Sequence, residues 1–573
     1  MDKLRTNGSE PEAHLAAPRR RLWIAALVAL VAGSAAVVAV ALRSRDASTV
    51  RKDATQRPAP PPRGAFATGG VPSNADPALV RALQETLPDW VIALDRLTTA
   101  SRENDPRGFD EAERAMATAR EQLLGAEVRN LLGRAGVDRL RDVLDRAKDA
   151  AGAAREDDAK TAASEFLEAV GAFNDALAAS GFGFYVDGDV ISGPNSRRLV
   201  LLYMFRVVHV RLFESDTRRV RALQLRRLDK LNWTHRLLGF TSPHLREALV
   251  LLDQVDELLV NYVLPALSPG ADVELFDEAS MERPATWQTR VRDRAGQVIR
   301  TEYAATQGLD AAATVRLGQL LLARRKLFDR WTRALEGRGV VLRQPRTLRI
   351  ERFDDLRQML DGAVPDSELD ELDELERNLH AKVNDRVFDA VRDVIIASVE
   401  RHEVQHRIDA ALPTARPVPA PLEQYTGPLL DRRGEPRELV QLARDELSAY
   451  LAELARDRLT PRVNFTLISR FLFDRDRWGS AECYAALVIF EGLASELDVA
   501  IEGELVVSGS IDREVIAEVY LAVTDRPEAE VRAAAEKLWE RLFKASLPAI
   551  EIVHTDLDVA GGDSSRAAGA GGL

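Results

Sequence analysis

The residues with the clearest chemical potential lie in the segment RHEVQHRID, from Arg401 to Asp409. His402 and His406 stand four residues apart, and Glu403 directly follows the first of them. On a helix, this spacing puts both imidazoles one turn apart on the same side, where they can bind one metal ion. Glu403 is then placed to accept a proton from metal-bound water without being a ligand. The pattern predicts a Zn²⁺ site together with its catalytic base.

The histidine pair continues an apolar stripe, which favours a buried position. Residues 384–411 have the periodicity of one long helix, in which apolar residues from Val387 to Ile395 recur at four-residue steps. An amphipathic helix with two hydrogen-bonded histidines is the simpler alternative. Glu400 and Arg407 add weight to that alternative, because zinc-binding helices usually carry uncharged residues at these two positions. Since zinc needs a third protein ligand, the choice depends on whether the chain supplies one.

Two positions close to the motif are poor third ligands. A further histidine six residues after His406 is excluded, because Leu412 stands there. Asp409 lies on the histidine side of the helix but about 10 Å along the axis from His402. It is better suited to a hydrogen bond with His406 than to the metal.

A better third ligand lies downstream in RDELSAYLAELA, residues 444–455. Glu446 there shares one helical stripe with Leu439 and Leu442. A carboxylate among apolar side chains is costly unless something pairs with it, and a metal ion would do so. Glu453 and Glu482 are the alternatives for the third ligand.

The combination of HExxH with a second helix that carries E-x-x-A and a polar residue resembles the gluzincin metallopeptidases. The matching residues are His402, Glu403, His406, Glu446, Ala449 and Tyr450. The resemblance implies that the helical glutamate is the third zinc ligand, that the small residue lets the two helices approach, and that the next polar residue supports the site. Tyr450 departs from the commoner aspartate. The resemblance covers only His402 to Leu451.

The expected activity is that of a zinc-dependent peptidase that hydrolyses peptide bonds with metal-activated water. Glu403 would take the water proton and pass it to the leaving amine. Tyr450, or Tyr425 in RPVPAPLEQYTGP, would donate a hydrogen bond to the oxyanion. The expected partner is a protein or peptide substrate. The alternative function is a non-catalytic envelope scaffold or partner-binding protein, including an inactive peptidase fold.

An uncharged segment near the N-terminus predicts a membrane anchor. Residues 22–42, LWIAALVALVAGSAAVVAVAL, follow an arginine triplet at 19–21. As a helix they would span roughly 31 Å, which matches the hydrocarbon core of a bilayer. A cleaved signal peptide is the alternative, since AVA at 39–41 resembles a cleavage site. We expect a single-pass protein of the cell membrane whose bulk lies outside the cytoplasm, which is the periplasm if the cell is Gram-negative.

Composition narrows the class of protein. The chain has 573 residues, a net charge of −12 and a single cysteine, Cys483, which excludes an internal disulfide. The negative charge argues against nucleic-acid binding, because such proteins are usually basic on at least one domain. None of this predicts an oligomeric state.

The expected fold is mainly α with a smaller α+β middle region, an N-terminal transmembrane helix and a zincin-like helical metallopeptidase domain. The N-terminal part is predicted to contain a cytoplasmic tail (1–21), the anchor (22–42) and a Pro/Gly-rich linker (43–77). A helical bundle (78–180) and an α+β region with antiparallel strands (181–352) follow. The helical metallopeptidase-like domain (353–547) and a disordered tail (548–573) complete the chain. Within the α+β region we expect strands at 199–213 and 219–228, a helix at 243–267 and short strands at 340–351.

Overall fold

The computed structural model describes residues 77–555, except 154–155, 193–197, 217, 229–237, 242–245, 270, 272–273, 278–283, 307–308, 337–341, 413–414, 432–433, 435 and 458. The predicted tail and anchor, 1–42, and almost all of the linker lie outside the described residues. Within the part that is described, no helix is both long and apolar enough to cross a membrane.

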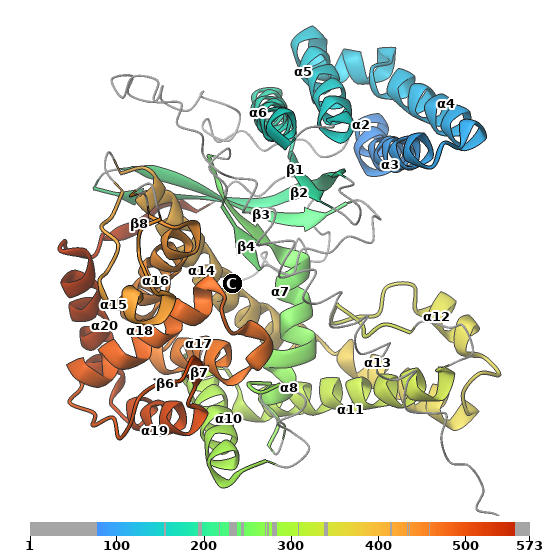
Figure 1. Cartoon of the computed structure of the whole chain (residues 1–573). Coiled ribbons are helices and arrows are strands. Elements are labelled where there is room, and N and C mark those ends of the chain that lie inside the picture. Colours follow the sequence, from blue (N-terminus) through green and yellow to red (C-terminus); the bar gives the residue numbers. More distant parts are fainter. Residues whose placement is uncertain are drawn as a thin grey trace, which may run out of the picture. The chain divides into compact units, whose positions relative to one another are not determined.

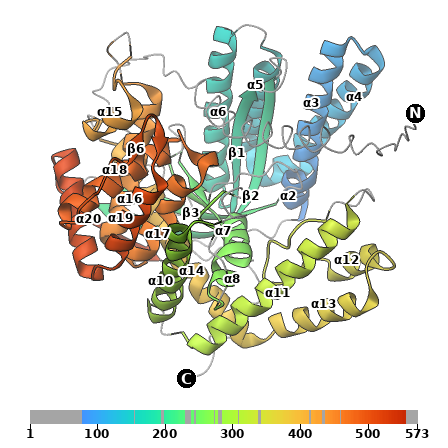
Figure 2. The ribbon, with the colours of Figure 1, turned by 60° about the horizontal axis from the view of Figure 1, so that its bottom comes forward.

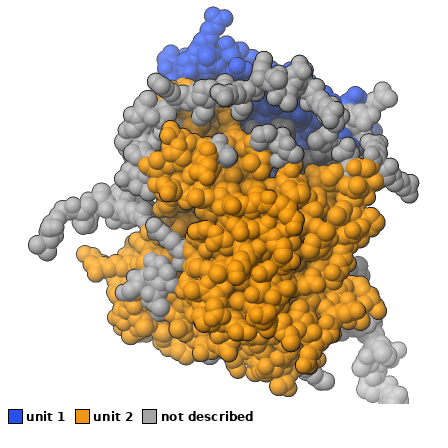
Figure 3. All heavy atoms as spheres, turned by 90° about the vertical axis from the view of Figure 1, so that its left-hand side faces the viewer, with its two compact units in different colours: residues 1–62, 85–173, 186–202 blue, residues 63–84, 174–185, 203–573 orange. Residues whose placement is uncertain are grey.

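The protein is mainly helical, with one mixed sheet, as Figure 1 shows. It divides into two compact units, which Figure 3 colours separately. Of the described residues, one unit contains 85–173 and 186–202, and the other contains 77–84, 174–185 and 203–555. The predicted helical bundle at 78–180 is helical throughout its main elements: α2 (Pro77–Arg81), a π-helical turn (Ala82–Thr86), α3 (Leu87–Glu103), α4 (Pro106–Leu123), α5 (Ala126–Gly152) and α6 (Glu156–Ala179).

Local sequence explains the first helical hairpin. Asn104 ends α3 in the left-handed conformation that asparagine tolerates, and Pro106 occupies the first turn of α4, where its missing N–H costs nothing. α3 and α4 pack closely against each other. The apolar face of each helix is buried, and Leu97 of α3 and Met116 of α4 lie on these faces.

The sheet confirms the antiparallel strands expected at 199–213 and 219–228. Its strands are β1 (Phe184–Ser192), β2 (Arg198–Ser215), β3 (Arg219–Arg227), β4 (Gly239–Phe240), β5 (Ala248–Leu251) and β8 (Ile550–Thr555). Their order is β1-β2-β3-β5-β4, and β8 pairs with β2. β2 and β3 form an antiparallel hairpin, β5 is parallel to β3, and β4 is antiparallel to β5.

Two expectations about strands were wrong because apolar runs do not reveal their partners. The helix expected over 243–267 begins only at Leu252, since Ala248–Leu251 form β5 between β3 and β4, with all four residues buried. A short, wholly apolar run fits a buried strand as well as a helix. The disordered tail expected from residue 548 is also wrong at its start, because Ile550–Thr555 pair with β2 as β8.

The short strands expected at 340–351 do not form in the described part of that segment. The buried guanidinium of Arg324 donates to the backbone carbonyls of Thr347 and Leu348, at 2.9 and 2.8 Å. It also pairs with Glu376 at 2.9 Å. The segment satisfies its carbonyl groups on this arginine instead of on a sheet, so its extended sequence does not produce a strand.

The region 353–547 is helical as expected. Its helices are α12 (Phe353–Leu360), α13 (Asp366–Leu379), α14 (Lys382–Ala410), α15 (Pro421–Thr426), α16 (Glu438–Arg456), α17 (Pro461–Phe473), α18 (Ala481–Glu496), α19 (Arg513–Thr524) and α20 (Glu528–Phe543). A short ladder of β6 (Val506–Val507) and β7 (Ser510–Ile511) interrupts them. One hydrophobic core runs from Val250 to Leu547, across the boundary predicted at residue 353.

Further helical segments precede this region in the same unit: α7 (Leu252–Leu258), a π-helical turn (Leu259–Val263), α8 (Leu264–Ala266) and the longer pair α10 (Thr286–Thr306) and α11 (Ala311–Leu335). In Figure 2, α11 and α13 lie side by side, and Phe328 and Leu372 belong to their shared core. α10 packs on α17 and α19, which closes the main core on that side.

Helix α14 is attached to the sheet through a buried charge. It packs on β3, β5 and β4. Glu400 on α14 is fully buried, and it accepts hydrogen bonds from Arg211 of β2 at 2.6 Å and from Gln224 of β3 at 2.9 Å. Burial raises the pKa of Glu400, and Arg211 opposes this effect. Glu400, which is an unusual charged residue two positions before His402 in a zinc-binding helix, therefore joins α14 to the sheet.

We expect Glu400→Ala to lower the free energy of unfolding by about 3–5 kcal/mol, because it leaves Arg211 and Gln224 without their buried acceptor. Urea denaturation followed by tryptophan fluorescence would measure it. Glu518→Ala is the matched control, since Glu518 pairs with Arg290 at the surface and both side chains are more than half exposed. The control should change stability by about 1 kcal/mol or less. Equal losses in the two variants would contradict a special role for the buried pair.

Candidate metal centre

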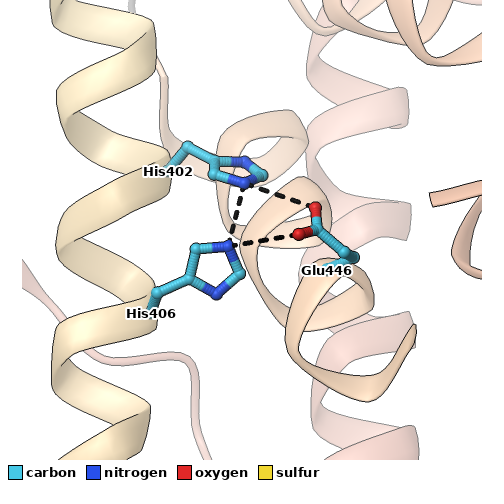
Figure 4. Close-up of side chains that lie close together, drawn as sticks. All are labelled: His402, His406 and Glu446. Carbon is cyan, nitrogen blue, oxygen red and sulfur yellow. Dashed lines mark hydrogen bonds and ion pairs between the residues drawn. The ribbon is translucent and has the colours of Figure 1, made fainter. Parts of the chain in front are cut away.

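Helices α14 and α16 pack together and bring the three predicted metal ligands to one point, as Figure 4 shows. His402 and His406 come from α14 and Glu446 from α16, and one potential ligand atom of each lies within 4.8 Å of the others. The two Nε2 atoms are 3.0 Å apart. Glu446 Oε2 is 3.4 Å from His402 Nε2, and Oε1 is 3.7 Å from His406 Nε2.

Small and polar residues of α16 explain why the helices come so close. Ala449 is fully buried, and Ser448 donates to Asp409 of α14 at 2.6 Å. The indole N–H of Trp539, on α20, donates to the same serine hydroxyl at 3.2 Å. This network fixes the register of α16 against α14, and thereby the height of Glu446 opposite the histidines.

Asp409 does not have the role that the sequence suggested. It was expected to bond His406, but its carboxylate accepts from Ser448, Gln405 and Arg416, with Arg416 Nε at 2.5 Å. No hydrogen bond joins Asp409 to His406 among the residues described, although its charge is felt there. The charge-assisted bond to Arg416 and the approach of α16 turn this side chain toward the helix interface.

Glu453 hydrogen-bonds the ring nitrogen of His402 that faces away from the shared point. Its Oε1 lies 2.6 Å from His402 Nδ1. Such a carboxylate places the ring proton on Nδ1 and leaves the lone pair of Nε2 directed at the shared point. Sequence reasoning named Glu453 only as an alternative ligand. Its position seven residues after Glu446 puts both carboxylates on one helical stripe of the sequence, but that stripe does not show which of them bonds His402.

Tyr450 lies between these two glutamates and touches the site directly. Its ring centroid is 4.9 Å from that of His402, and its hydroxyl hydrogen-bonds the carboxylate of Glu446. Tyr425, the other proposed oxyanion donor, bonds Glu491 of α18 at 2.9 Å instead. No contact of Tyr425 with His402, His406 or Glu446 appears in the described structure.

Glu403 is buried beside the cluster and is not one of its three converging ligands. Burial raises the pKa of Glu403 to about 8, although the neighbouring His402 opposes the shift. Its side chain lies against the edge strand β4, where a methyl group at Gly239 would be 2.8 Å from Glu403 Cγ. A nearby divalent cation would lower this pKa and leave the carboxylate ready to accept a proton.

The two imidazoles have opposite proton affinities. Burial lowers the pKa of His402, but Glu453 and Glu446 outweigh it, so the pKa lies well above its usual value. Burial and the charge of His402 lower the pKa of His406 to about 4. Two Nε2 atoms 3.0 Å apart cannot both carry protons. One proton shared between the two atoms accounts for this distance, and a cation bound by both nitrogens and Glu446 would use both lone pairs instead.

The surrounding carboxylates also favour a cation. Burial raises the pKa of Glu453 and of Glu482, which lies at the start of α18. Glu446 is the exception, because the two histidines outweigh burial and hold its pKa below the usual value. Glu482 is not one of the three converging ligands, but it is close enough to Glu446 for the two negative charges to repel each other. Two nitrogens and one carboxylate in an acidic, half-buried site fit Zn²⁺.

We expect Gly239→Ala to lower stability by about 1–3 kcal/mol, the usual cost of overpacking. The added methyl would lie 2.7 Å from the backbone oxygen of Leu249 and 2.8 Å from Glu403 Cγ, so both the sheet and the glutamate must shift. Differential scanning calorimetry would measure the change. Gly152→Ala is the control, because nothing lies within 4 Å of its added methyl. A Gly239→Ala protein as stable as this control would contradict the tight contact.

Comparison with protein-family models, with curated proteins and with solved structures finds no match for this chain.

Proposed function

We propose that the chain is a zinc-dependent peptidase with a gluzincin-type, zincin-like centre in which His402, His406 and Glu446 hold the metal. The observation that supports this most is the convergence of two Nε2 atoms and one carboxylate on a single point. The bond from Glu453 to His402 Nδ1, at 2.6 Å, adds the outer support that zinc-binding histidines usually have. The simpler alternative, a helix with two hydrogen-bonded histidines, shares the bond to Glu453 but does not require Glu446 beside both Nε2 atoms.

The reaction would be hydrolysis of a peptide bond. Bound Zn²⁺ would supply Lewis-acid activation of the scissile carbonyl and of water. Glu403 accepts the proton of the attacking water and delivers it to the leaving amine. Its buried position suits this role, since a base works best with a pKa near neutrality. Tyr450 orients Glu446 through its hydroxyl, so an oxyanion bond from Tyr450 would require that hydroxyl to turn away.

The edge of the sheet supports a peptide as the substrate. β4 is the last strand in the order β1-β2-β3-β5-β4, and Glu403 packs against its Gly239. An extended peptide can add to the edge of a sheet through main-chain hydrogen bonds. A peptide bound along β4 would pass beside the proposed base.

The proposed location is the outer face of the cell membrane, with residues 22–42 as an uncleaved anchor. The support is the uncharged run itself and the arginine triplet that precedes it. A membrane-bound peptidase would act on proteins or peptides outside the cytoplasm.

We expect mutants of the full-length protein to distinguish the metal ligands from the catalytic base. Wild type should contain about one Zn²⁺ per chain by elemental analysis, and His402→Ala or His406→Ala should lose it. Glu446→Gln should weaken zinc binding by more than the 10–100-fold typical of an outer-shell loss, and Glu453→Gln by about that amount. Glu403→Gln should keep zinc but lower peptide hydrolysis at least about 100-fold.

Glu518→Gln, at the exposed surface of α19, is the control and should change neither property. If Glu446→Gln retains full zinc occupancy and activity, the third ligand has been misassigned. Zinc binding without hydrolysis of any peptide would favour the non-catalytic alternative.

The membrane anchor is tested separately. The protein should stay with membranes after carbonate washing, and an export-dependent reporter fused after Leu573 should be active, because an uncharged helix of this length spans the bilayer. A soluble protein with a new N-terminus near Leu42 would instead show a cleaved signal peptide. A reporter that works only in the cytoplasm would contradict the orientation.

A further inference from the structure

Arg470, on α17, is half-buried, and its guanidinium lies over the ring of Phe471. Its Nε atom is buried and has no hydrogen-bond partner, and its guanidinium forms no ion pair among the described residues. The fully buried Arg324, in contrast, is paired with Glu376. A guanidinium that is partly withdrawn from water and has no carboxylate partner can be stabilised by an anionic ligand that binds it.

The guanidinium lies on the Tyr450 side of the candidate metal centre. Arg470 Cζ is 5.2 Å from the ring centroid of Phe471, and that ring is 6.0 Å from the ring of Tyr450. The ring of Tyr450 in turn is 4.9 Å from that of His402. Burial and Glu446 raise the pKa of Tyr450, and Arg470 is close enough to oppose the shift.

The groups around Arg470 leave its charge available for a ligand. Arg477 lies over the same Phe471 ring, with Cζ at 5.4 Å, but it is paired with Asp474 at 3.1 Å. Glu482 affects Arg470 through its charge, yet its own hydrogen bond is to Ser480. Burial and the neighbouring Arg477 lower the pKa of Arg470 to about 10, so it stays cationic at neutral pH.

We propose that Arg470 binds a carboxylate of the substrate, so that the site prefers peptides carrying a free C-terminal carboxylate or an acidic side chain near the cleaved bond. This inference rests on the proposed peptidase function. The planar guanidinium can bind a carboxylate with two parallel hydrogen bonds, which a lysine cannot do. Phe471 lies beside the guanidinium and Tyr450 beside Phe471, so both rings would contact the apolar part of the same ligand.

The test measures binding and so does not depend on turnover. Full-length Glu403→Gln protein, loaded with zinc, is titrated into three fluorescent peptides of matched sequence: one with a free C-terminal carboxylate, one amidated, and one amidated with an added glutamate. Fluorescence anisotropy should show that one of the two acidic peptides binds on the order of 10–100-fold more tightly than the neutral peptide. Which of the two it is identifies the source of the carboxylate.

Adding Arg470→Met should abolish the preference, and Arg470→Lys should reduce it several-fold at least. Arg475→Met is the matched control, because Arg475 is an exposed arginine nearby, and it should keep the full preference. Circular dichroism and zinc content check that each variant is folded. If Arg470→Met fails to fold, the Arg470→Lys protein decides the question.

Equal binding of all three peptides, or a preference that survives at Arg470→Met and Arg470→Lys, would overturn the inference. Failure of the proposed function has a different signature, namely wild-type protein that hydrolyses none of the three peptides. An Arg470-dependent preference without hydrolysis would uphold carboxylate binding and reject the peptidase. Hydrolysis of all three peptides with the same KM in wild type and in Arg470→Met would do the reverse.

Discussion

Burying glutamates against two imidazoles is costly unless positive charge is supplied, and this constraint organises the central part of the molecule. Glu403, Glu446 and Glu453 all lie around His402 and His406. Two kinds of positive charge suit the cluster. A protonated His402 can donate to Glu453 and to the neutral His406. A divalent cation bound by Nε2 of both histidines and by Glu446 would be the alternative.

The fold positions that cluster by holding α14 on two sides. Toward the sheet, Glu400 is fixed by Arg211 and Gln224. Toward the helices, Asp409 is bonded to Ser448, and Trp539 donates to the same serine. These contacts are buried polar ones, so they specify rotation and register more sharply than apolar packing would. The distance between the histidines and Glu446 is therefore set by both contacts of α14, through Glu400 to the sheet and through Asp409 to α16.

Much of the site was predictable because it depends on helical periodicity. His402, His406 and Glu446 lie on apolar stripes, and the stripes alone predict that the three side chains face the interior. The bonds of Glu453 and Asp409 were not predictable, because each depends on which rotamer the facing helix permits. Arg470 was missed for the same reason: nothing in the sequence of α17 shows that its guanidinium lacks a carboxylate partner.

The errors in the fold share a cause as well. Ala248–Leu251 reads as the start of a helix until β3 and β4 are placed on either side of it, and Ile550–Thr555 becomes a strand only because β2 offers an edge. Likewise, 342–350 avoids a sheet because Arg324, on the preceding helix α11, binds two of its carbonyls. Strand pairing is non-local and therefore harder to infer from sequence than the long helices were.

X-ray absorption at the zinc edge of the loaded full-length protein tests the central claim most directly. The account predicts a first shell of nitrogen and oxygen at about 2.0–2.2 Å, with the outer scattering of two imidazole rings and no sulfur at about 2.3 Å. Replacing His406 by alanine should remove the ordered zinc signal. A protein that binds no zinc, or that binds it without imidazole scattering, would contradict a metal centre built from His402, His406 and Glu446.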